Sequence, residues 1–241
     1  MIKKFLLFLM LNNLFVICFA QNSHPAIKKT VSKINEFVPV GWKLIAEAKG
    51  DLNKDGLVDV ALVIENTDPK NFISNADRLG GDTLNTNPRY VLVAFKMKNG
   101  LYEMVAKNAS FIPTQNSTES PCLTDPFGEN GSIEIAKGLL SIHFQNFYSC
   151  GAWEIYNFDY IFRFQNQKFE LIGYNKSSMH RSSGEQTSTT LNFSTMKMDY
   201  TSGTNAFKDG GKLKTTWKTI KPRKLLELGT ITEDSVDGFT Y

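Results

Sequence analysis

Short apolar and alternating stretches, separated by turn residues, recur along most of the chain. Their alternation and their content of β-branched and aromatic residues predict strands. The predicted strands are 42–48, 60–66, 89–96, 101–106, 132–136, 139–145, 153–164, 168–174, 187–193, 197–201 and 212–220. Hairpin turn signals such as Asn99-Gly100 join many of them. The pattern therefore predicts a mainly β (α+β) fold of antiparallel sheets, arranged as a sandwich, an incomplete barrel or two blade-like units.

One N-terminal segment has the spacing of a helix. Apolar residues recur at intervals of four, three and four from Ile27 to Val38, which places them on one face of a helix over residues 25–38. Proline suits a first helical turn and blocks continuation, so Pro25 and Pro39 agree with these limits. We therefore expect one N-terminal helix.

The predicted strand 153–164 carries aromatic rings at its even-numbered positions from Tyr156 to Phe164. Alternate side chains of a strand share one face, so the rings form a continuous stripe. The stripe indicates a core-facing surface, and an exposed ligand platform is the alternative. Two long irregular segments, 67–88 and 113–132, interrupt the strands, and loops of this length are often functional.

The stretch from Asp51 to Asp59 has the composition of a calcium loop. Oxygen donors recur at alternate positions around a glycine turn, which is how a short loop surrounds a hard cation. The expected ligands are the side chains of Asp51, Asn53, Asp55 and Asp59 and the backbone carbonyl of Leu57. An EF-hand is excluded, because position twelve is Leu62 rather than Glu and a predicted strand follows instead of a helix. A polar hairpin turn without metal is the alternative interpretation.

The pattern is D-x-N-x-D-G-x-x-D followed directly by an apolar strand. It resembles the calcium loop of FG-GAP (VCBS-type) repeats. The resemblance covers about fifteen residues, and no second copy of the pattern occurs. It implies Ca²⁺ as the cofactor and Asp51, Asn53, Asp55, Leu57 and Asp59 as its ligands. Over most of its length the chain also resembles uncharacterised exported bacterial proteins with a single FG-GAP-like loop, which implies a compartment and calcium but carries no known activity.

The N-terminus has the form of a secretory signal peptide over residues 1–20. Lys3 and Lys4 precede an apolar run, and small residues allow cleavage before Gln21. A lipid anchor at Cys18 is the alternative. Residues 21–241 would then be a single β-rich domain, or two β subunits of about 21–112 and 132–241. We expect a periplasmic, cell-surface or secreted protein with no transmembrane segment after cleavage.

Removal of the signal peptide leaves 25 of the 27 basic residues against 24 acidic ones, a balance that gives no sign of nucleic acid binding. It also leaves two cysteines, Cys122 and Cys150. An even pair in an exported protein predicts one disulfide, with two buried thiols as the alternative.

A second polar cluster contains the weak catalytic candidates His180, Ser182 and Glu185 in one predicted loop. These side chains could perform acid–base or nucleophilic chemistry if they met in space, although no nucleophile motif surrounds the serine. The first functional hypothesis is a calcium-stabilised binding or interaction module, whose partner is an unknown protein or small ligand. The alternatives are a secreted hydrolase that uses the His180–Glu185 loop, and a protein inhibitor or immunity-type partner that binds through its two long loops.

Overall fold

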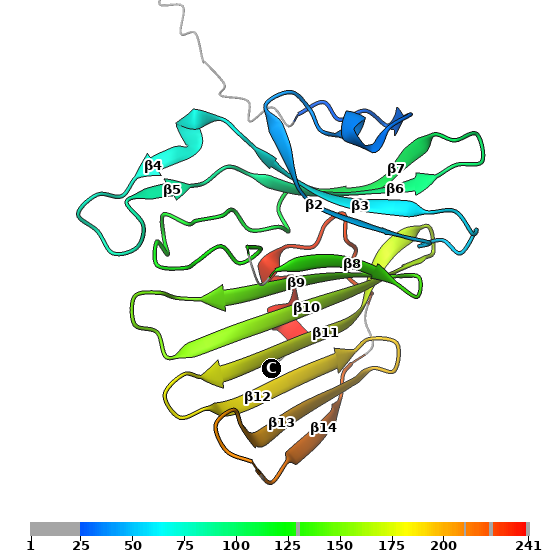
Figure 1. The fold of residues 1–241 in the computed structure, drawn as a ribbon. Coiled ribbons are helices and arrows are strands. Elements are labelled where there is room, and N and C mark those ends of the chain that lie inside the picture. Colours follow the sequence, from blue (N-terminus) through cyan, green and yellow to red (C-terminus); the bar gives the residue numbers. More distant parts are fainter. Residues whose placement is uncertain (1–24, 129–130, 210, 222–223, 240–241) are drawn as a thin grey trace, which may run out of the picture.

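The computed structural model describes residues 25–128, 131–209, 211–221 and 224–239. The expected signal peptide and Cys18 lie outside the described residues. The described chain is mainly β, and every strand pairing in it is antiparallel, which confirms the predicted fold class (Figure 1). No helix in the described part is long and apolar enough to cross a bilayer.

The first sheet has five strands in the order β1-β7-β6-β3-β2. Their bounds are β1 (Thr30–Val31), β2 (Trp42–Gly50), β3 (Asp59–Asn66), β6 (Arg89–Lys96) and β7 (Tyr102–Asn108). The central strands β3 and β6 are buried along almost their whole length, because separate apolar clusters cover the two faces of the sheet. Burial on both faces explains why these two strands are continuous apolar runs.

The second sheet has seven strands that follow one another in chain order, from β8 to β14. Their bounds are β8 (Ser132–Ala136), β9 (Leu139–Phe147), β10 (Glu154–Gln165), β11 (Lys168–His180), β12 (Glu185–Asn192), β13 (Lys197–Asn205) and β14 (Lys214–Thr219). The β8–β9 turn at Lys137-Gly138 and the β10–β11 turn at Asn166-Gln167 have positive φ at both residues. Such turns match the twist of the strands they join, so the chain forms a meander of hairpins.

One hydrophobic cluster joins the two sheets. It contains Val63 and Val93 from the first sheet, Leu140 and Phe162 from the second, and Val236 near the C-terminus. The five-stranded sheet lies across the β8 end of the seven-stranded sheet, while β12, β13 and β14 extend away from it (Figure 1). The two predicted β runs are therefore two open sheets that share a core.

The N-terminal helix expected over residues 25–38 does not form. That segment contains β1 and one short 3-10 helix, η1 (Ile34–Phe37). The apolar residues still pack against the outer face of the first sheet, next to the cluster of Val60 and Leu92. The backbone of Val31 instead pairs with Tyr102, so strand pairing at the sheet edge overrides the helical spacing.

The aromatic stripe of β10 divides between core and surface. Tyr160 and Phe162 are buried, whereas Tyr156, Phe158 and Phe164 are partly exposed. The core interpretation therefore holds for the middle of the strand.

The first long loop contains structure that its composition does not reveal. The short helix η2 (Pro69–Asn71) precedes a small hairpin of β4 (Phe72–Ser74) and β5 (Thr83–Asn85). The C-terminal 3-10 helix η3 (Glu233–Phe239) lies against the second sheet, behind β9 to β11 in Figure 1, where the Tyr160 hydroxyl donates to the Glu233 carbonyl.

Candidate functional site

The expected calcium loop is the turn between β2 and β3. β2 ends at Gly50 and β3 begins at Asp59, and these two residues are paired in the antiparallel ladder. Lys54 and Gly56 have positive φ, which bends the loop back on itself. Glycine adopts this conformation without steric cost, which accounts for Gly56 at the sharp turn.

The Asp51 carboxylate organises the loop by accepting hydrogen bonds from its backbone. Oδ1 accepts from the N–H groups of Lys54 and Asp55 at 2.6 and 3.2 Å, and Oδ2 accepts from Gly56 at 2.9 Å. Asn53 Oδ1 accepts from the Asp55 N–H at 3.0 Å. The loop is therefore closed by its own side-chain oxygens, which lie on the inside of the bend.

Asp59 forms the base of the loop and is fully buried. Its Oδ2 accepts from the Leu52 N–H and its Oδ1 from the Lys96 N–H, both at 2.9 Å. Burial raises the pKa of Asp59 above its ordinary value, although backbone hydrogen bonds from Leu52, Lys96 and Asn53 oppose that rise, and the nearby Asp55 carboxylate adds to it. A buried carboxylate with a raised pKa lacks a compensating positive charge.

The chemistry of this donor set fits Ca²⁺, which takes carboxylate, amide and backbone oxygens. Each oxygen of Asp59 accepts one of these backbone bonds, and an ionised carboxylate has about four lone-pair sites, so acceptor capacity remains. Among the described residues, no three His, Cys, Asp or Glu side chains are already gathered as a metal-holding group. Calcium binding by Asp51, Asn53, Asp55, Leu57 and Asp59 thus stays a prediction.

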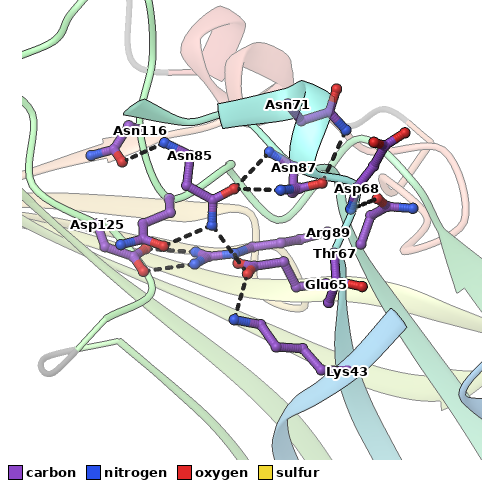
Figure 2. A network of polar contacts seen from close by, with 12 residues as sticks. Lys43, Glu65, Thr67, Asp68, Asn71, Asn85, Asn87, Arg89, Asn116 and Asp125 are labelled. Carbon is purple, nitrogen blue, oxygen red and sulfur yellow. Dashed lines mark hydrogen bonds and ion pairs between the residues drawn. The ribbon is translucent and has the colours of Figure 1, made fainter. Parts of the chain in front are cut away.

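A buried polar network lies at the other end of β3 (Figure 2). The side chains of Arg89 and Glu65 are 4% and 2% exposed, and Arg89 Nε lies 2.6 Å from Glu65 Oε2. Arg89 also binds Asp125 through two parallel bonds, at 2.6 and 2.7 Å. Lys43 Nζ approaches Glu65 Oε1 at 2.8 Å from the surface. The two cations match the two carboxylates, so the network is balanced in charge.

Asparagine residues extend this network to the two long loops. Asn85 Nδ2 donates to Glu65 Oε1 at 3.2 Å and to Gln115 Oε1 at 2.8 Å. The Asn85 N–H donates to Asn116 Oδ1, and the Asn116 N–H donates to the Asn85 carbonyl. Pro121 also contacts Gly80 so closely that a side chain at position 80 would not fit. The two loops therefore lie against each other rather than extending separately into solvent.

The disulfide between Cys122 and Cys150, predicted from the cysteine count, is present. It connects the second long loop to the segment after β9. Next to it, a backbone bridge pairs Leu123 with Tyr148. A polar cleft of about 340 Å³ opens between this loop, the end of β9 and η3.

The catalytic candidates lie in the hairpin turn between β11 and β12. The hydroxyls of Ser182 and Ser183 lie 3.2 and 3.1 Å from His180 Nδ1. The His180 ring stacks on Trp153, with ring centroids 5.9 Å apart. Glu185 begins β12, and its backbone N–H donates to Ser183 Oγ. The structure thus brings serine and histidine together locally, and the hydrolase hypothesis stays a prediction.

Comparison with known proteins finds no matching family model, no matching curated protein and no matching solved structure.

The sequence interpretation did not single out the buried network. Glu65 and Arg89 stand at the ends of apolar strands, where charged residues usually face water, and Asp125 lies in a loop. The available signal was a carboxylate at the end of β3 and an arginine at the start of the next long apolar strand. Antiparallel pairing of the two strands places these residues opposite each other.

Proposed function

We propose that this chain is an exported β protein that binds calcium in the loop 51–59 and acts as a binding or interaction module. The observation that carries the proposal is the arrangement of oxygen donors in the β2–β3 turn, above the buried carboxylate of Asp59. Bound Ca²⁺ would supply the positive charge that this carboxylate lacks. The ion would fix the turn that joins two strands of the central sheet, so its role would be structural.

The binding role rests on the fixed loop between β7 and β8. The loop after β7 is held in place by a disulfide, by the bidentate Arg89–Asp125 ion pair and by the Asn85–Asn116 hydrogen bonds. Loops held on a rigid sheet frame are typical positions for binding residues. Such preorganisation also lowers the entropy lost when a ligand binds.

Calorimetric titration of the purified protein with CaCl₂ tests the metal site. Wild type is compared with Asp55→Ala and with Asp82→Ala, an exposed aspartate outside the loop that serves as the matched control. We expect saturable binding to wild type and Asp82→Ala, with a rise in melting temperature, and neither effect in Asp55→Ala. Binding that survives Asp55→Ala, or no binding to wild type, contradicts the calcium site.

Export is tested separately in a bacterial host that expresses the chain with its own N-terminus. Mass spectrometry of the periplasmic fraction should identify Gln21 as the first residue. A lipid-modified Cys18 would support the anchored alternative, and an intact Met1 in the cytoplasm would contradict export.

A further inference from the structure

The cleft beside the disulfide has an unusual uncharged polar lining. Its polar side chains include Gln115, Asn116, Ser117, Ser120, Asn146 and Tyr148. None of its described lining residues is basic, and Glu233 supplies the one carboxylate. This composition disfavours anionic ligands and offers amide and hydroxyl groups to a neutral one.

Asn146 Oδ1 is the one buried side-chain polar atom in the described part of the chain that has no hydrogen-bond partner. Asn146 lies on β9 and lines the cleft. Buried polar groups in native proteins almost always have a partner, and an unsatisfied one is costly to keep. The orphaned acceptor therefore lacks a donor, and since its accessible surface is below 1 Å², a group in the cleft reaches it only when the Asn146 carboxamide turns toward the cleft.

Two neighbouring side chains have donor groups left for the same ligand. Ser117 Oγ accepts from the backbone N–H groups of Glu119 and Ser120, which leaves its O–H to donate elsewhere. Asn116 uses its oxygen to accept from Asn85, and its amide nitrogen donates to no other residue in the described part of the chain. The cleft thus presents both donors and an acceptor, which is the complement of a group of hydroxyls.

Apolar surface completes the lining. Leu123, Pro113, Pro126 and the ring of Tyr148 line the same cleft. Small-molecule sites combine apolar and aromatic walls with a few fixed polar groups, and their volumes begin near 300 Å³. A pyranose ring has hydroxyls around its edge and C–H groups on its faces, so it matches both parts of this lining.

We propose that this cleft binds a neutral saccharide, and that the Asn146 carboxamide turns toward the cleft so that Oδ1 accepts a hydrogen bond from a ligand hydroxyl. The inference rests on the proposed role as a binding module and names its ligand class. Tyr148 and Leu123 are fixed by their backbone bridge, and Asn116 is fixed by Asn85, so these three lining residues are positioned before the ligand arrives.

The test screens glucose, galactose, mannose, N-acetylglucosamine, maltose, cellobiose and chitobiose by saturation-transfer NMR on the full protein. Each sugar is present at about 10 mM, above the millimolar dissociation constants of weak ligands. Hits are then titrated by calorimetry against wild type, Asn146→Leu and Asn175→Leu. Asn175 is a half-buried asparagine on β11 whose side chain points to the opposite face of the same sheet, so it provides the matched control.

We expect at least one sugar to bind saturably, with an affinity that Asn146→Leu lowers roughly tenfold and Asn175→Leu leaves unchanged. Asn146→Leu should keep or raise the melting temperature, since it removes an unsatisfied buried acceptor. A purely structural asparagine that holds a water would instead lower the melting temperature when replaced, and that result overturns the proposal. So does an Asn146→Leu variant that binds sugar as well as wild type, or a screen with no hit.

Co-sedimentation with insoluble chitin, cellulose and peptidoglycan distinguishes a polymer from a free sugar as the source of the ligand. Calcium titration of the same samples separates this inference from the proposed function. Calcium binding and export without sugar binding would reject the saccharide site alone. Sugar binding without calcium binding would reject the metal site and leave the cleft intact.

Discussion

Arg89 and Asp125 form a bidentate ion pair between the five-stranded first sheet and the loop that leads to the second sheet. Arg89 Nη1 lies 2.6 Å from Asp125 Oδ1, and Nη2 lies 2.7 Å from Oδ2. The Nε group of the same arginine binds Glu65. One guanidinium therefore ties two carboxylates from segments that are far apart in the chain, a task that its planar set of donors suits.

Replacing Arg89 by methionine should lower the free energy of unfolding by about 3–5 kcal/mol, because two carboxylates lose their buried counterion. Urea denaturation measures the change. Lys43→Met is the matched control, since Lys43 binds the same Glu65 but its side chain is 54% exposed. That control should lose no more than about 1 kcal/mol. Equal losses in the two variants would contradict the assigned role of Arg89.

The same network predicts a dependence of stability on pH. Burial acts to raise the pKa of Glu65, but the bonds to Lys43 and Arg89 outweigh it and hold the pKa below its ordinary value of 4.5. A lowered pKa in the folded state means that Glu65 stabilises the fold above pH 4.5 and that this stabilisation is lost as pH falls through the folded value. Unfolding free energies measured from pH 6 to pH 3 should fall more steeply in wild type than in Glu65→Gln.

The strands could be predicted because each signal was local. Alternation identified β10, and continuous apolar runs identified β3 and β6 before their double burial was known. Turn residues such as Lys137-Gly138 placed the hairpins of the second sheet. Since consecutive hairpins form a meander, the order of β8 to β14 follows the chain.

The features that were missed depend on contacts distant in sequence. The spacing of Ile27 to Val38 fits a helix equally well, and only pairing with β7 decides for the strand β1. The network around Arg89 joins residues 24 and 36 positions apart, which no local pattern reveals. The unsatisfied oxygen of Asn146 likewise depends on what surrounds it in space.

Removing the disulfide by Cys122→Ser with Cys150→Ser should lower stability by about 3–4 kcal/mol, given the sequence separation of 28 between the two cysteines. Urea denaturation of wild type with and without dithiothreitol provides an independent comparison. The reduced protein should match the double variant. A reduced protein as stable as the oxidised one would show that the ion pair of Asp125 alone fixes this loop.

The aromatic stripe of β10 is divided between core and surface, so replacing its residues by alanine should lower the free energy of unfolding by unequal amounts. Phe162 has no exposed surface, so Phe162→Ala should cost about 3–5 kcal/mol in urea denaturation. Phe158 is half-buried and lies near the Lys176 ammonium, 5.7 Å from the ring centroid, so Phe158→Ala should cost less. A larger loss of stability for Phe158→Ala than for Phe162→Ala would contradict the assignment of Phe162 to the core.

Asp59 is an expected calcium ligand, and burial raises the pKa of its carboxyl group. Because the folded state prefers the protonated acid, the ionised form destabilises the metal-free fold once pH exceeds the raised pKa, and this penalty is absent below the ordinary value of 3.8. Asp59→Asn removes the buried charge, but its amide NH₂ group then faces one of the two backbone N–H donors, so the metal-free protein should lose up to about 3 kcal/mol of stability. Calcium needs the ionised carboxylate, so the rise in melting temperature with CaCl₂ should vanish in Asp59→Asn and weaken in wild type on acidification. An undiminished rise in the variant would exclude Asp59 as a ligand, while loss of folding without metal would show that its bonds to Leu52 and Lys96 are the dominant contribution.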